Sequence, residues 1–91
     1  MKETAKAVVT VIGKDMVGIL AKVSTACAQA NANVIEVTQS VLESFFCMVM
    51  IIDITDANKS IEQLQKAIAA EVPAMQVHVM HENIFNSMHR I

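Results

Sequence analysis

Residues 45–52 read FFCMVMII, an unbroken apolar run that ends at Asp53. The run is too short to cross a bilayer and has the length of a strand. Alternate positions of a strand face opposite sides of a sheet, and here both sets are apolar, so both faces need cover. We therefore expect residues 45–55 to form a central strand, and the elements on either side to define the rest of the fold.

Periodicity predicts the elements around this strand. Ser60 followed three residues later by Gln63 predicts a capping box at the start of the second helix. The second strand alternates apolar and polar residues, so we expect it to bury Ile35, Val37 and Val41 on one face. The elements are, in chain order, a Val-rich strand at 6–12, an amphipathic helix at 18–30, an alternating strand at 33–43, the strand at 45–55, a helix from 60 to before Pro73, and a strand at 75–82.

This order, βαββαβ, predicts an α+β fold of the ferredoxin-like type, with a four-stranded antiparallel sheet in the order 4-1-3-2. Two helices cover only one face of such a sheet, which leaves an apolar centre on the other face and predicts a partner. A stripe of Ile84, Phe85 and Met88 in a short C-terminal helix is the alternative cover. We expect one domain over residues 6–82 and a helical tail over 83–91.

Composition sets limits on function. With 91 residues the chain makes one small domain, and 54% hydrophobic residues suggest apolar surface buried against a partner. A net charge of −2 offers no basic surface for nucleic acid. We expect no membrane segment and a cytoplasmic location. Cys27 and Cys47 form no disulfide framework; they read as two buried thiols, with a redox pair as the alternative.

Catalytic and metal-binding patterns are missing where the common functions of this fold require them. A copper carrier needs Cys-x-x-Cys in the first loop, a phosphate clamp needs Arg there, and an RNA binder needs aromatic residues on the central strands. His78 and His81 are three apart on a strand and face opposite ways. We therefore predict a protein that is not an enzyme and has no catalytic residue, no metal site and no cofactor.

The loop that leads into the first helix is the best candidate for a binding site. Asp15 is the expected N-cap, and Gly18 lies where the loop becomes helix. A helix N-terminus presents unpaired N–H groups and the positive end of the helix dipole, which suit a carboxylate. The alternative is that Gly18 only lets the helix pack closely on the sheet.

These residues carry a family resemblance. KDMVGIL at 14–20 resembles the D-x-x-G-I/L loop of ACT domains, and NANV at 31–34 lies at the matching turn, where those domains often carry Gly-x-Asn-Ile/Val. Asn31 stands in place of the usual Gly, and Asn can adopt the same left-handed conformation. With its tail, the whole chain is similar to a family of small stand-alone ACT proteins of bacteria and archaea that has no assigned function.

The resemblance implies a regulatory module that senses a small ligand, most often an amino acid. ACT domains pair side by side through the second strand and first helix, and the ligand lies at the interface of the homodimer. Carried over residue by residue, this implies a ligand-binding site made of Asp15, Gly18, Ile19 and Leu20 from one subunit and Asn33 and Val34 from the other.

Two hypotheses follow. The first is a non-catalytic amino-acid sensor that works as a homodimer and passes its signal to a separate protein partner. The second is a protein–protein interaction module with no small-molecule ligand, which uses the dimer or its apolar sheet face. Melting the protein in the presence of each amino acid distinguishes them, because a ligand that binds only the folded state raises the melting temperature.

Overall fold

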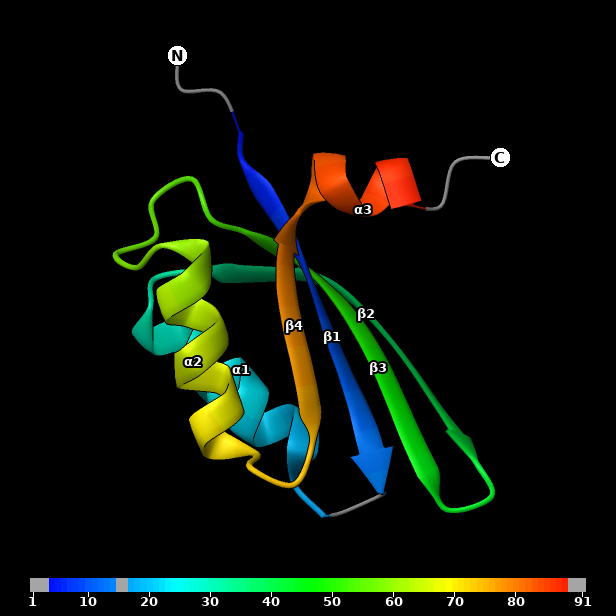
Figure 1. Ribbon diagram of the computed structural model, residues 1–91. Coiled ribbons are helices and arrows are strands. Elements are labelled where there is room, and N and C mark those ends of the chain that lie inside the picture. Colours follow the sequence, from blue (N-terminus) through cyan, green and yellow to red (C-terminus); the bar gives the residue numbers. More distant parts are fainter. Residues whose placement is uncertain (1–3, 15–16, 89–91) are drawn as a thin grey trace.

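The fold is an open sheet with two helices on one face and a third, short helix at one end (Figure 1). The computed structural model describes residues 4–14 and 17–88. The sheet is antiparallel in the order β2-β3-β1-β4, which confirms the predicted topology. The elements are β1 (Lys6–Lys14), α1 (Ile19–Gln29), β2 (Asn33–Leu42), β3 (Phe45–Asp53), α2 (Ile61–Glu71), β4 (Gln76–His81) and α3 (Glu82–Met88).

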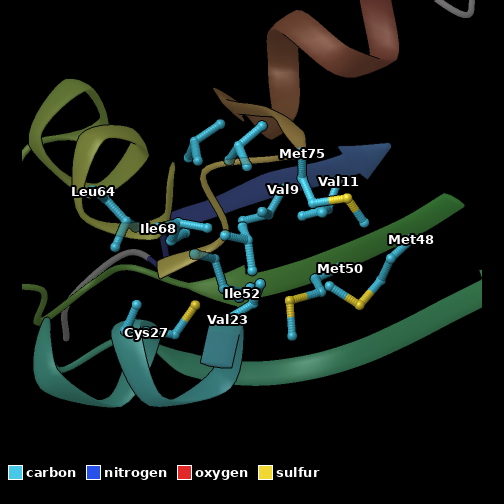
Figure 2. Close-up of a cluster of buried hydrophobic side chains, with 14 of the residues drawn as sticks. Val9, Val11, Val23, Cys27, Met48, Met50, Ile52, Leu64, Ile68 and Met75 are labelled. Carbon is cyan, nitrogen blue, oxygen red and sulfur yellow. The ribbon is translucent and has the colours of Figure 1, made fainter. Parts of the chain in front are cut away.

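The hydrophobic core fills the space between the sheet and the helices α1 and α2. Figure 2 shows Val23 and Cys27 of α1 and Ile68 of α2 pointing toward side chains of the two central strands, such as Met50. These four residues are fully buried. The central position of β3, expected from its two apolar faces, is therefore confirmed, since it pairs with β1 on one side and β2 on the other.

The second strand departs from the expected alternation. Its pairing with β3 shifts between Val34 and Glu36, which is a β-bulge. An extra residue reverses which positions face the core, so Val34 and Val37 pack against the core while Ile35 is 48% exposed. Val41 is 51% exposed, because the end of the β2–β3 hairpin projects away from the two helices (Figure 1). The expected burial of Ile35 and Val41 is wrong.

The start of α2 and the end of α1 are as the sequence predicts. The backbone N–H of Gln63 donates to Ser60 Oγ at 3.1 Å, and the N–H of Ser60 donates to Gln63 Oε1 at 2.9 Å, so the capping box of α2 is confirmed. After α1, Asn31 has a φ of 58°, the left-handed conformation that stops a helix. This turn brings the chain directly into β2.

The third helix packs against β1 and β4. Val8 faces the side of the sheet opposite the core and is only 3% exposed, which places this helix over one end of that side. Phe85 is half-buried, but Ile84 is 55% exposed, so the predicted docking of Ile84 is wrong. The side chain of Met88, the third member of that stripe, lies outside the described residues.

The two edges of the sheet differ. At the β4 edge, the N–H of Val79 donates to the side-chain oxygen Oε1 of Gln65, a residue of α2, at 2.8 Å. This bond occupies a backbone donor in the middle of a strand of only six residues. The β2 edge is ten residues long and largely exposed. Only the β2 edge therefore offers a long strand for pairing with another chain.

Candidate functional site

The N-terminus of α1 begins at a glycine in an unusual conformation. Gly18, not Asp15, occupies the N-cap position, and Asp15 lies outside the described residues. Gly18 has a φ of 84° and gives the helix no side-chain cap. Its carbonyl accepts the first helical hydrogen bond from Lys22 N–H at 3.0 Å. The N–H groups of the first turn have no partner within the helix, so they can bind an anionic group.

The surroundings of Gly18 decide between its two predicted roles. A Cβ built at this position meets no atom within 4 Å, and the residue is exposed. Gly18 therefore does not serve close packing of the helix on the sheet, and that alternative is wrong. Its positive φ, which other L residues rarely adopt, makes glycine the suitable residue. Among the described residues, there is therefore room for a side chain or a ligand atom beside Gly18.

The two residues after Gly18 point in different directions. Ile19 is 3% exposed and belongs to the core, so its side chain anchors the helix and only its backbone can face a ligand. Leu20 is 37% exposed and presents an apolar side chain at the surface. The first turn thus combines open N–H groups with one accessible apolar side chain.

At the other end of α1 lies a shallow hollow of about 250 Å³, lined by Ala28, Asn31, Ala32 and Asn33. Asn33 is exposed, whereas Val34 is half-buried against the core. The predicted site included Asn33 but not Ala28, Asn31 or Ala32. Small side chains near a helix end that precedes a strand are the signal that could have indicated a hollow.

Hydrogen bonds fix the wall of this hollow. Asn31 Nδ2 donates to the carbonyl of Asp56 at 2.9 Å. Asn58 Nδ2 donates to the carbonyl of Gln29 at 3.2 Å, and its backbone N–H donates to the carbonyl of Ala30 at 2.9 Å. The loop before α2 is therefore tied to the end of α1, where the hollow lies.

One chain does not bring the predicted residues together. Gly18, Ile19 and Leu20 lie at the start of α1, and Asn33 and Val34 follow its end. The helix between them has 11 residues, or about 16 Å at 1.5 Å per residue. A single small ligand cannot touch both groups in one chain. A joint site requires a second copy.

The two cysteines, both within the described part of the chain, do not form a reactive centre. Cys27 is buried in the core, where burial raises the pKa of its thiol, and Cys47 is exposed. Because Cys47 is offset by one residue from the buried Met48, it faces the side of the sheet away from Cys27, which excludes a redox pair between them. The prediction of two buried thiols is wrong for Cys47.

Three further features of the described residues bear on the class of site. Within residues 4–14 and 17–88, no three His, Cys, Asp or Glu side chains gather in a way that could hold a metal ion. Hydrogen bonds from the side chain and backbone of Thr55 lower the pKa of Asp53, which is a local contact at the end of β3. No helix in the described part of the chain is long and apolar enough to cross a membrane.

The fold, an antiparallel sheet with two helices on one face, is of the ferredoxin-like class. The chain belongs to the ACT domain family, whose model matches residues 6–82 and whose domains are regulatory, ligand-binding modules.

Relatives span bacteria and archaea and match nearly the whole chain. A UPF0237 protein of Listeria monocytogenes is 40% identical over 88 residues, covering 94% of this chain and 99% of the relative. A UPF0237 protein of Methanopyrus kandleri is 43% identical over 90 residues, covering 94% of this chain and 98% of the relative. Among solved structures, an ACT domain protein from Streptococcus pneumoniae superposes with a TM-score of 0.76 at 28% identity, covering 96% of this chain and all of that one.

Proposed function

We propose that this protein is a non-catalytic sensor that binds an amino acid at the interface of a homodimer. The observation that carries the proposal is the N-terminus of α1, where the N-cap Gly18 gives the first turn no side-chain cap and where a Cβ built at Gly18 meets no atom within 4 Å. A carboxylate can accept hydrogen bonds from such groups and is stabilised by the helix dipole.

The difference between the sheet edges supports pairing through β2. The β4 edge is short and its Val79 N–H already has Gln65 as partner, whereas the ten-residue β2 edge is exposed. An exposed strand edge pairs readily with a second copy of itself. Pairing about a twofold axis makes the two β2 strands, and with them the two α1 helices, antiparallel.

Antiparallel α1 helices explain why the predicted residues form two groups. The Gly18 end of one helix then lies beside the Asn33 end of its partner, so the open N–H groups face the hollow across the interface. The ligand's carboxylate binds the N–H groups of one subunit, and its amino group binds the side-chain oxygen of Asn33 or a backbone carbonyl of the other. The exposed Leu20 contacts the ligand's apolar part.

Such a site couples binding to assembly. A ligand held by both subunits binds the dimer and not the monomer, so it stabilises the dimer by mass action. The signal is then a change in the population or rigidity of the dimer that a separate protein partner recognises.

The test is a melting experiment with each of the proteinogenic amino acids, followed by calorimetric titration of any that stabilises the protein. One amino acid that raises the midpoint by several degrees, together with a shift from monomer to dimer in sedimentation, supports the proposal. A flat panel rejects amino-acid sensing and favours the second candidate, an interaction module. That candidate is supported by exposed apolar side chains, Ile12 and Phe45 among them, on the face of the sheet opposite α1 and α2.

A further inference from the structure

The face of the sheet opposite α1 and α2, called here the open face, is covered at one end only. α3 follows β4 directly and packs on β4 and β1, at the end where His81 pairs with Ala7. Val8, at this end, is buried. The other end of the open face, where β1 finishes and the β2–β3 hairpin turns, lies beyond α3.

That far end carries a group of exposed apolar side chains. Lys14 pairs with Phe45, and Phe45 pairs with Leu42, so these residues lie side by side on three adjacent strands. Phe45 is 61% exposed and Leu42 is 73% exposed. Ile12, one pleat back on the same face, is 44% exposed. We call Ile12, Leu42 and Phe45 the far patch.

The covered end presents a matching feature. α3 stands above the sheet by the thickness of a helix, about 10 Å. It carries Ile84, which is 55% exposed although the helix is docked. Among the described residues, α3 thus offers one exposed apolar side chain, Ile84, at the raised end, and the low end of the open face carries three.

We propose that a second copy of this chain, turned end for end, places its α3 on the far patch, so that Ile84 of each copy packs against Phe45 and Ile12 of the other. The contact is isologous, because each copy supplies one raised helix and one uncovered patch, and the twofold rotation satisfies both at once. This contact lies on the open face, separate from the β2 edge, and goes beyond the proposed sensor dimer.

The area involved suits a specific contact. With about 200 Å² for a fully exposed large apolar side chain, the far patch and Ile84 present roughly 450–500 Å² on each copy. Two copies then bury on the order of 1,000 Å², the lower bound for a specific interface. Charges beside the far patch are mixed, with Lys14 on β1 and Glu43 in the turn between Leu42 and Phe45, so the contact rests on its apolar area. With pairing through β2, this second contact makes a dimer of dimers.

Sedimentation at micromolar concentration tests the contact through matched variants. Phe45→Lys and Ile84→Glu, each alone, are expected to halve the mass of the assembly, because each places a charge in an apolar contact. The double variant F45K/I84E is expected to regain the wild-type mass, because the two new charges then face each other across the interface. The control is Lys66→Glu, a charge change at an exposed position of α2 that lies outside both proposed contacts, which is expected to keep the wild-type mass.

Circular dichroism of each variant establishes that it is folded, as expected for substitutions at exposed positions. An unchanged mass for both single variants overturns the proposal, and so does a double variant that stays at half mass. The outcome is distinguishable from failure of the sensor dimer. If pairing through β2 does not occur, wild type is a dimer and the two single variants are monomers; if only the open-face contact is wrong, wild type and all variants are the same dimer.

Discussion

The N-termini of α1 and α2 begin two helices of equal length in opposite ways. α2 opens with a capping box in which Ser60 and Gln63 satisfy each other's backbone N–H groups. α1 opens with Gly18 in a left-handed conformation, and no side chain caps its first turn. The donors of α2 are thus used for stability, and those of α1 are left available. At the start of the helix without a side-chain cap, a Cβ built on Gly18 meets no atom within 4 Å.

The largest effect is expected from Gly18→Asp, which adds to α1 a side chain that occupies the ligand's place and repels its carboxylate. Loss of one charge-assisted hydrogen bond is worth roughly 1.5–3 kcal/mol, or ~10-fold to ~100-fold in affinity, before steric exclusion is counted. The measurement is calorimetric titration of the stabilising amino acid. Gly18→Asn is the matched control, because Asn has the same size and tolerates positive φ, so any additional loss in the Asp variant reports charge. Wild-type affinity in the Asp variant would show that the site lies elsewhere.

Gly18→Ala tests whether the left-handed backbone conformation at the start of α1 requires glycine. Ala has room at this position, since nothing lies within 4 Å of a Cβ there, but it must adopt a φ near +84°. The expected loss is about 1–2 kcal/mol of unfolding free energy, measured by urea denaturation. Gly18→Asn is expected to lose less, since Asn adopts this conformation more readily. Equal stability of the Ala variant and wild type would mean that the left-handed start of α1 is not required.

Ser60→Ala removes the side-chain cap of α2 and is expected to cost about 1 kcal/mol of unfolding free energy. Ligand affinity should not change, because the α2 N-terminus takes no part in the proposed site. Denaturation and titration of the same sample check both statements. A weaker affinity in this variant would contradict the conclusion that the start of α2 serves stability alone and the start of α1 serves binding.

Within the proposed site, the smaller effect is expected from Asn33→Ala. This change removes one polar partner from the edge of the hollow and fills no space, so the affinity should fall by about 1.5 kcal/mol, the low end for a hydrogen bond to a charged group such as the ligand's ammonium. The ranking of Asn33→Ala below Gly18→Asp in titration is the critical result. A larger loss of affinity for Asn33→Ala than for Gly18→Asp would indicate that the main ligand contacts lie at the hollow beside the end of α1.

The order of elements, the central place of β3 and both ends of α2 followed from sequence, because periodicity and capping are local. The bulge at Val34–Glu36 did not, since no Gly marks it and the register between strands is set by tertiary packing. That single residue is why Ile35 is exposed. In the site, the open position of Gly18 was anticipated, but the burial of Ile19 and the hollow depend on how α1 meets its neighbours.

The bond from Val79 N–H to Gln65 has a consequence for solubility. If two chains join through β2, the outermost strand on each side of the combined sheet is β4. An unguarded outer strand recruits further chains and leads to fibrous aggregates. A glutamine side chain from α2 is already hydrogen-bonded to that strand, so an incoming chain must first displace it. The Gln65 side-chain amide thus favours a closed oligomer over fibrous aggregation, which matters for a small chain rich in apolar residues.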